Sequence, residues 1–301
     1  MNKRYPSVMM ATALIPWNEN YEFMPDVFEV QVKHMIDGGL NHIYLFGTAG
    51  EGYAVNNNQF RTIVKLFSKI MKADGLYPMV GLIDMSVARM KEKLEIAYSF
   101  GIREFQFSIP CWAQLNNDEI FSFFDALLPF YPDCKFLNYN LGKTKRLLEP
   151  EELFELAELH PNFVAVKQTR GEESDLVAIT SSDTPLQFFV TERNFLNLSK
   201  MTECGLLMSI SNTDLKLATD LFTACQKGDF STAEHIMNIF WNIRTEMINS
   251  INFPAIDGVY DKLYTKFNVP EFPLRLLPPY QYASDKVYEK FAATTRLLLK
   301  I

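Results

Sequence analysis

Residues 163–169 read FVAVKQT, an apolar, strand-like run that contains one lysine, Lys167. β-Branched and aromatic residues are typical of strands, and a strand this apolar is normally buried on both faces. Lysine is almost never fully buried without a partner, because removing an ammonium group from water is costly. The fold therefore has to provide a place for the Lys167 side chain.

Similar strand-like runs recur along the chain, and a helical pattern follows each of them. The eight runs lie at residues 7–15, 42–47, 77–83, 103–109, 135–140, 163–169, 187–192 and 205–211. Strands that alternate with helices pair in parallel, and eight such units predict a closed α/β fold, the (β/α)8 TIM barrel. An open doubly wound sheet is the alternative, but no G-x-G-x-x-G dinucleotide-binding motif follows the first run.

The predicted barrel domain covers residues 1–227, and residues 228–301 show no further strand pattern. This second segment has helical patterns that are broken at prolines, among them Pro254, Pro270 and Pro273. We expect it to form a C-terminal helical extension that packs on the barrel.

Composition excludes several classes of protein. The chain of 301 residues has a formal charge of −7 and no long Lys/Arg cluster, which argues against a nucleic-acid or membrane surface. No stretch reaches the roughly 18 apolar residues of a membrane span. The four cysteines form no C-x-x-C pair and are expected to be reduced, and we predict a cytoplasmic protein.

In a (β/α)8 barrel the active site forms where the strands end. After the second strand the chain reads GTAGEG at residues 47–52, and glycines there let backbone N–H groups approach an anion such as a carboxylate. A glycine-rich turn that caps a helix is the alternative. Tyr139 ends the fifth strand on the same face as Leu137, and it points either into the barrel mouth or into the core.

The period-2 alternation of the sixth strand predicts which of its side chains point inward. Phe163, Ala165, Lys167 and Thr169 share the inward face, and Val164 and Val166 face the helices. An interior of low dielectric lowers the pKa of an ammonium, and a neutral amine attacks a carbonyl to form a Schiff base. A lysine paired with a buried carboxylate, or a strand end that reaches the surface, is the alternative.

Three motifs at fixed places in the predicted fold resemble one known family. They are G-x-x-G-E from Gly47 to Glu51, Y-N at residues 139–140, and a lysine 28 residues beyond Tyr139. Together they resemble the dihydrodipicolinate synthase/N-acetylneuraminate lyase family of class I, Schiff-base aldolases, over nearly the whole chain. This resemblance implies a TIM barrel with C-terminal helices, a homo-oligomer (tetramer or dimer), and a small 2-oxo acid such as pyruvate as the partner.

The resemblance also implies roles for individual residues. Lys167 matches the lysine that condenses with the ketone of the 2-oxo acid, and Tyr139 matches the tyrosine that shuttles protons. Gly47, Thr48 and Ala49 match the loop that holds the substrate carboxylate. The protonated imine is itself the electron sink, so no cofactor or metal is implied, and the four histidines show no metal-ligand spacing.

Three features depart from the synthase branch of this family. Ala49 stands where the family has a second Thr or Ser, and Trp112 occupies the place of a tyrosine that completes the synthase proton relay. Residues 140–144 lack the usual proline, and Lys143 substitutes only loosely for the synthase arginine because it has no bidentate fork.

The lyase branch is matched better, although not in every position. Residues 167–171 read KQTRG and resemble the K-Q-T-x-G of N-acetylneuraminate lyases more than the K-E-A-x-G of the synthases. Glu192 matches the acidic residue that holds sugar hydroxyls, and Ser209 matches a serine that contacts the sugar chain. Val190 replaces a glycine, and the added charge of Arg193 suggests an acidic or otherwise altered substrate tail.

We therefore rank three hypotheses. The first is a 2-oxo acid aldolase or lyase that acts on a sugar acid or a related 2-oxo acid through Lys167 and Tyr139. The second is dihydrodipicolinate synthase, which joins pyruvate to aspartate semialdehyde. The third is a non-catalytic barrel that binds a 2-oxo acid. The candidate substrate-binding residues are Gly47, Thr48, Ala49, Trp112, Glu192 and Ser209.

Overall fold

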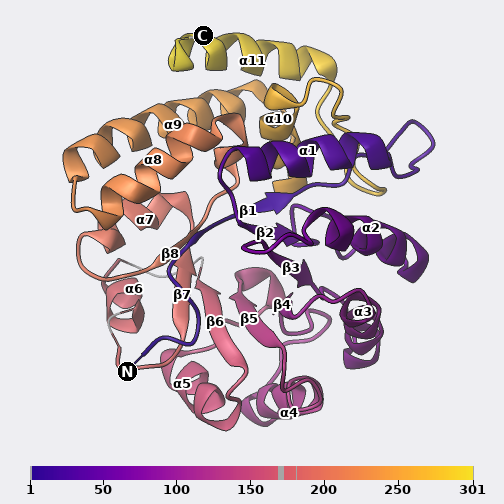
Figure 1. Cartoon of the computed structure of the whole chain (residues 1–301), viewed down its shortest axis with the longest axis vertical. Coiled ribbons are helices and arrows are strands. Elements are labelled where there is room, and N and C mark those ends of the chain that lie inside the picture. Colours follow the sequence, from indigo (N-terminus) through magenta and orange to yellow (C-terminus); the bar gives the residue numbers. More distant parts are fainter. Residues whose placement is uncertain (1, 169–172, 181, 301) are drawn as a thin grey trace.

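A computed structural model describes residues 2–168, 173–180 and 182–300 of the chain. Eight parallel strands close into a barrel in sequence order, and β1 pairs with both β2 and β8 (Figure 1). The strands are β1 (Met9–Ala13), β2 (His42–Leu45), β3 (Tyr77–Gly81), β4 (Glu104–Phe107), β5 (Lys135–Asn140), β6 (Phe163–Gln168), β7 (Gln187–Val190) and β8 (Gly205–Leu207). The predicted TIM barrel is confirmed.

A helix follows each strand and covers the outside of the barrel (Figure 1). These helices are α1 (Pro25–Asp37), α2 (Asn57–Ile70), α3 (Val87–Ser99), α4 (Asn117–Leu127), α5 (Pro150–Leu159), α6 (Glu173–Thr180), α7 (Glu192–Ser199) and α8 (Leu215–Gln226). Two short 3-10 turns, η1 (Gly142–Thr144) and η2 (Ile210–Thr213), follow β5 and β8. The predicted eighth strand is thus shorter than expected, because residues 210–211 belong to η2.

Local sequence explains where several helices begin. The Asn56 side chain accepts hydrogen bonds at the start of α2 while the Gln59 side chain accepts from the Asn56 N–H, which is a capping box. Asn116 and Glu119 form the same arrangement at α4. Pro150 opens α5 at a position where its missing N–H costs no hydrogen bond.

Three more helices complete the chain: α9 (Phe230–Ser250), α10 (Asp257–Asn268) and α11 (Asp285–Leu299). In Figure 1, α9 runs beside α8, and α11 is the outermost element. The predicted domain boundary at residues 227 and 228 stays a prediction, since α8 and α9 pack together across it. Among the described residues, none of the helices is both long and apolar enough to span a membrane.

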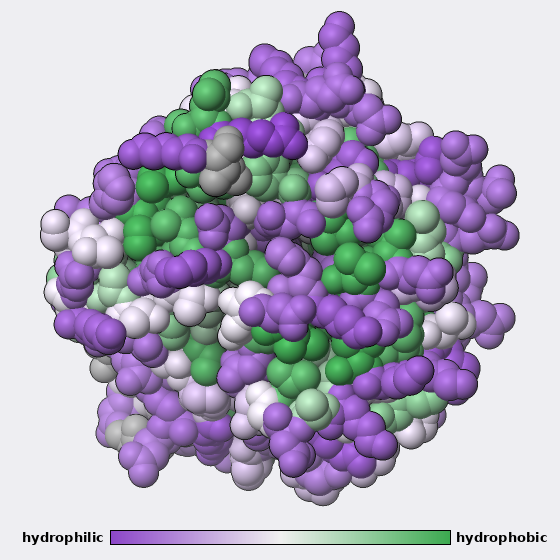
Figure 2. Space-filling model, turned by 45° about the horizontal axis from the view of Figure 1, so that its top comes forward, coloured by the Kyte–Doolittle hydropathy of each residue, from purple (hydrophilic) through white to green (hydrophobic). Residues whose placement is uncertain are grey.

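The barrel strands separate two apolar layers. An inner cluster fills the barrel and includes Met10, Met79, Leu137 and Phe189, while a larger outer cluster lies between strands and helices. A parallel sheet that is covered on both faces requires this arrangement. On the molecular face in Figure 2, hydrophobic residues appear as patches between hydrophilic ones.

The inward face of β6 differs from the prediction at its first two residues. Ala165 belongs to the inner cluster as expected, but Phe163 packs in the outer layer, 5.3 Å from the Phe124 ring of α4, and Val164 lies in the inner cluster. The β5–β6 register shifts at this point, and an extra residue on one strand reverses the alternation. The prediction for Phe163 and Val164 was therefore wrong.

The other side chains of that strand follow the prediction, and part of the motif remains outside the structural description. Val166 packs in the outer layer, and Lys167 lines the cavity at the barrel mouth. Thr169, Arg170 and Gly171, on which the K-Q-T-x-G comparison rests, lie outside the described residues.

A buried ion pair fastens the C-terminal helices to the barrel. Lys262 of α10 lies with its Nζ 2.8 Å from Oε2 of Glu51 in the loop after β2, and both side chains are 0% exposed. Glu51 also accepts hydrogen bonds from Trp17 Nε1 at 3.0 Å and from the Leu277 N–H at 2.6 Å. One carboxylate therefore joins the β1 region, the β2 loop, α10 and the segment before α11.

We expect Glu51→Gln to lower the free energy of unfolding by about 3–5 kcal/mol, because it leaves the Lys262 ammonium buried without a countercharge. Glu29→Gln is the matched control, since Glu29 forms an exposed pair with Lys33 and its loss should cost under about 1 kcal/mol. Urea unfolding measures both values. Equal effects of the two substitutions would contradict a fastening role for Glu51.

Candidate active site

A cavity of about 300 Å³ opens where the barrel strands end. Most of the predicted site residues line it, from β5, β6, the first turn of α7 and the loops after β2 and β8. They are Thr48, Ala49, Tyr139, Lys167, Glu192 and Ser209. Active sites of TIM barrels form at this face, so the cavity is the candidate active site.

Lys167 and Tyr139 lie side by side in this cavity. They are register partners on the neighbouring strands β6 and β5, and each is 8% exposed. The Lys167 Nζ lies 4.1 Å from the centroid of the Tyr139 ring, within the range of a cation–π contact. The nucleophile and the hydroxyl group predicted from the sequence are therefore held together by strand pairing.

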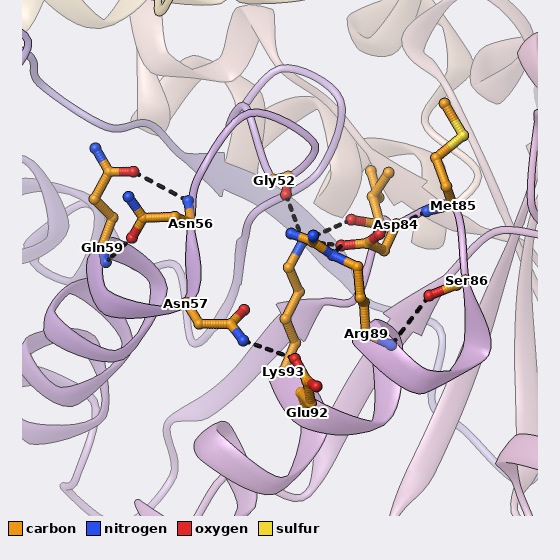
Figure 3. Close-up of polar contacts among 11 residues, drawn as sticks. Gly52, Asn56, Asn57, Gln59, Asp84, Met85, Ser86, Arg89, Glu92 and Lys93 are labelled. Atoms are coloured by element: carbon orange, nitrogen blue, oxygen red, sulfur yellow. Dashed lines mark hydrogen bonds and ion pairs between the residues drawn. The ribbon is translucent and has the colours of Figure 1, made fainter.

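Lys93 shows what a structural buried lysine requires. It is 1% exposed, and its Nζ donates to the carbonyl oxygens of Gly52 at 3.0 Å and Ile83 at 2.8 Å, as Figure 3 shows for Gly52. The Asp84 carboxylate lies 3.0 Å away and supplies the countercharge. Every ammonium proton thus has an acceptor.

Lys167 differs from the other buried lysines of the described chain, Lys93 and Lys262. Lys262 has both the Glu51 carboxylate and the Arg275 carbonyl oxygen as partners. Within the described residues, the Lys167 nitrogen donates to no hydrogen-bond acceptor: the Tyr139 ring lies beside it, and its charge acts on Asp257 and Asp261 without a hydrogen bond. A lysine nitrogen without an acceptor can react with a ligand in the cavity.

The loop after β2 lines the same cavity and contains backbone N–H groups without an acceptor in the described chain. A Cβ at Gly47 would lie 2.1 Å from the Tyr44 hydroxyl oxygen, so only glycine fits there. Thr48 and Ala49 follow, and in the described part of the chain their N–H groups donate to no acceptor. Two adjacent free N–H groups suit the binding of a carboxylate.

The structure corrects the prediction that Trp112 belongs to the site. Its side chain is 79% exposed, and it does not line the cavity. It lies in the loop between β4 and α4, beyond the end of the strand, and only its carbonyl oxygen is engaged, by Lys145 Nζ at 2.6 Å. A place in a sequence motif does not determine the direction of a loop side chain, so we remove Trp112 from the candidate site.

The C-terminal helices add residues to the cavity that sequence reasoning missed. They are Trp241 and Arg244 of α9 and Asp257, Tyr260 and Asp261 of α10. The four-residue spacing of the two aspartates places them on one helix face, and this spacing was visible in the sequence. The sequence did not show that this face turns toward the barrel.

The two aspartates of α10 are in opposite electrostatic situations. Burial acts to raise the pKa of Asp257, but the Lys143 ammonium and the Thr48 hydroxyl outweigh it and hold that pKa below its ordinary value. Thr48 Oγ1 and Lys143 Nζ donate to Asp257 at 2.8 and 3.1 Å. Burial raises the pKa of Asp261 to about 8, and the Asp257 carboxylate adds to this shift. At neutral pH, Asp257 is ionised and Asp261 is mostly protonated.

Charged side chains also line the side of the cavity formed after β7. Glu192 is the first residue of α7 and is 8% exposed, and Arg244 Nη1 lies 3.7 Å from its Oε1. Arg193 follows Glu192 and lines the same cavity. This side therefore combines the Glu192 carboxylate, which can accept hydrogen bonds from hydroxyl groups, with two guanidinium groups, those of Arg193 and Arg244.

A TIM barrel whose mouth holds a buried lysine without an acceptor among the described residues is the arrangement that Schiff-base aldolases and lyases require. A profile of the Dihydrodipicolinate synthetase family matches residues 6–296. The chain belongs to this family, so the predicted family and its class of enzyme are confirmed.

Curated relatives are synthases of low identity. The chain is 26% identical over 257 residues to a 4-hydroxy-tetrahydrodipicolinate synthase of Exiguobacterium sp., covering 83% of this chain and 82% of the relative. The synthase of Porphyromonas gingivalis is 24% identical over 281 residues, or 92% of each chain. For the Synechococcus elongatus synthase, at 24% identity, the match spans only 60% of either chain.

Solved structures confirm the fold across both branches. N-acetylneuraminate lyase of Proteus mirabilis superimposes with a TM-score of 0.85 at 15% identity, covering 99% of both chains. YagE, a prophage protein of E. coli K12 solved in complex with pyruvate, gives a TM-score of 0.86 at 13% identity and covers 97% of this chain and 98% of its own. At these identities the likeness shows the shared fold alone.

The contrast between buried lysines predicts opposite effects on stability. We expect Lys93→Met to cost about 3–5 kcal/mol of unfolding free energy, because Asp84 loses its buried partner. Lys167→Met should cost nothing or stabilise the fold, because it removes a buried ammonium that has no acceptor. Thermal or urea unfolding of the two variants tests this, and a comparable loss in both would show that Lys167 has a structural partner.

Proposed function

We propose that the protein is a Schiff-base aldolase or lyase that produces or consumes pyruvate. The observation that carries the proposal is the Lys167 nitrogen, which is buried in the cavity, has no acceptor in the part of the chain that the structure describes, and lies beside Tyr139. YagE of the same fold was solved with pyruvate, which supports a 2-oxo acid as the ligand. Lys93 and Lys262 are unsuitable nucleophiles because their nitrogens are already engaged.

The geometry suggests how the chemistry proceeds. The free N–H groups of Thr48 and Ala49 bind the carboxylate of the 2-oxo acid, which brings its C2 carbonyl to the Lys167 amine. The amine adds to C2, and loss of water then gives an iminium ion. The iminium nitrogen then withdraws the electron pair of the adjacent C–C bond, so cleavage or formation of that bond requires no further electron sink. Tyr139 is placed to exchange protons beside the reacting carbon.

The substrate tail is proposed to be a sugar acid or a related hydroxylated 2-oxo acid. Glu192 and Ser209 line the cavity and can accept or donate hydrogen bonds to hydroxyl groups. Arg193 and Arg244 lie on the same side and favour a tail that carries a negative charge. These side chains fit an N-acetylneuraminate-type substrate better than they fit a short aldehyde.

Condensation of pyruvate with aspartate semialdehyde is the second candidate, because the curated relatives are named as synthases of that kind. Two observations weigh against it. Ala49 has no hydroxyl to relay a proton, and Lys143 donates to Asp257 instead of remaining free for the carboxylate of the aldehyde. A barrel that only binds the 2-oxo acid is the third candidate. The expected homotetramer or homodimer stays a prediction.

Reductive trapping tests the proposal. We expect incubation with pyruvate and borohydride to give a covalent adduct on the peptide that holds Lys167, detected by mass spectrometry. Lys167→Met should lose the adduct, whereas Lys216→Met, which alters an exposed lysine of α8, should retain it. A folded wild-type protein without an adduct would overturn both enzymatic candidates and leave the binding barrel.

A second assay separates the two enzymatic candidates once the adduct is seen. Release of pyruvate from N-acetylneuraminate supports the lyase, and consumption of pyruvate with aspartate semialdehyde supports the synthase. Exchanging Arg193→Gln should weaken the use of an anionic sugar acid, as a rise in KM, more than it affects pyruvate trapping. An unchanged KM would rule out Arg193 as a contact to the tail.

A further inference from the structure

Asp261 is a buried carboxyl group in the cavity for which neither the fold nor the resemblance supplies a role. It lies one helical turn after Asp257 on α10, and it is 4% exposed. It lines the same cavity as Lys167, Tyr139 and Ser209, and the Ser209 hydroxyl acts to lower its pKa. A polar side chain buried this deeply at a reactive lysine needs a chemical reason.

Two contacts hold this part of α10 in place. Lys262, the next residue, forms the buried ion pair with Glu51 of the β2 loop. Asp257, on the same helix face, accepts the Thr48 hydroxyl at 2.8 Å from that loop. Asp261 is therefore presented to the cavity by a rigid element, which catalytic groups require.

Charged and polar groups from several elements act on the Asp261 carboxyl group. Asp257 on its own helix and Glu192 of α7 act to retain its proton, and the Ser209 hydroxyl and the Lys167 charge on β6 act to release it. Burial is the largest influence and raises its pKa to about 8. Carboxyl groups whose pKa values are pushed apart in one site are characteristic of acid–base chemistry.

The remaining cavity groups leave few alternatives for proton transfer. Ala49 has only a methyl group. The Tyr44 hydroxyl already donates to Gln106 Oε1 at 2.5 Å, and burial raises its pKa well above the ordinary value. Asp257 is engaged by Thr48 and Lys143. Asp261 is therefore, with Tyr139 and Glu192, one of the described cavity groups that can carry a proton, and its raised pKa suits proton transfer near neutral pH.

We propose that Asp261 is a further catalytic residue that carries protons to and from the bound 2-oxo acid. The inference rests on the proposed function, because it requires the imine at Lys167. Its two steps, loss of water and formation of the enamine, occur with pyruvate alone and do not depend on the identity of the substrate tail.

Asp261 gives up its proton in the first step and regains one in the second. After the Lys167 amine has added to C2, the C2–O bond breaks, the nitrogen lone pair forms the C=N bond, and the Asp261 proton leaves with the hydroxyl group as water. The resulting Asp261 carboxylate faces the iminium cation. It then removes a proton from C3, the C–H electron pair forms the C2=C3 bond, the C=N electrons return to nitrogen, and the carboxyl group is protonated again.

Exchange of the pyruvate methyl protons in D2O, followed by NMR, tests this role. We expect Asp261→Asn to slow the exchange by roughly 100-fold or more, since positioned acid–base groups contribute factors of that size. The variant should still give the borohydride adduct at Lys167 after long incubation. Asp220→Asn, which alters an exposed carboxylate of α8, is the matched control and should exchange at the wild-type rate.

The pH dependence distinguishes a chemical role from a structural one. The protonated carboxyl group starts the cycle, so the exchange rate of the wild-type protein should fall as Asp261 ionises, with a midpoint at a pH of about 8, and Asp261→Asn should lack this fall. Ser209→Ala removes the hydroxyl that lowers the pKa of Asp261, so the fall should move to higher pH. This second variant retains the carboxyl group and tests the inference even where Asp261→Asn does not fold.

The outcomes separate the inference from the proposed function. Wild-type exchange rates in Asp261→Asn, or a pH profile that neither variant alters, would overturn the role of Asp261 while the adduct upholds the proposed function. A folded Asp261→Asn protein that no longer binds pyruvate would also overturn it, because Asp261 would then be needed for binding, whereas one that binds pyruvate without forming the adduct would support its role in the loss of water. Absence of the adduct in the wild-type protein would overturn the proposed function itself.

Discussion

The site depends on one buried ion pair, between Glu51 in the loop after β2 and Lys262 in α10. The same carboxylate accepts the Trp17 indole N–H and the Leu277 backbone N–H. Charges without solvent contact are tolerated only when all their hydrogen-bonding groups are satisfied, so the pair sets the position of α10 against the barrel narrowly. The loop that offers free N–H groups and the helix that supplies Asp257 and Asp261 are thereby held in contact with each other at one cavity.

The candidate functional groups in this arrangement are the polar groups that have no hydrogen-bond partner in the described chain. Lys93 and Lys262 are at least as deeply buried as Lys167, yet both donate to a carboxylate and to backbone carbonyl oxygens and serve the fold. Within the described chain the Lys167 nitrogen has the Tyr139 ring beside it and no hydrogen-bond acceptor, and the N–H groups of Thr48 and Ala49 are also unused. A nucleophile and an anion-binding pair on residues that line one cavity are the minimum that a Schiff-base enzyme of 2-oxo acids needs.

Much of this was predictable, because strand and helix periodicity are local properties. The eight units, the inward direction of Lys167 and its neighbour Tyr139 all followed from alternation and from motif spacing. Phe163 was misplaced because the irregularity in β6 arises from its pairing with β5, which the β6 sequence alone does not reveal. Asp261 was missed because the packing of α10, set by the distant Glu51, decides which of its faces meets the barrel. Trp112 was misplaced because its direction depends on the path of a loop.

The central claim is that Lys167 is the unpartnered nucleophile of a 2-oxo acid site. A crystal structure of the protein soaked with pyruvate tests it most directly. The account predicts continuous density from the Lys167 nitrogen to C2 of pyruvate, with the carboxylate of the ligand at the N–H groups of Thr48 and Ala49. Pyruvate bound in the cavity without a bond to Lys167, or bound only elsewhere, would contradict it.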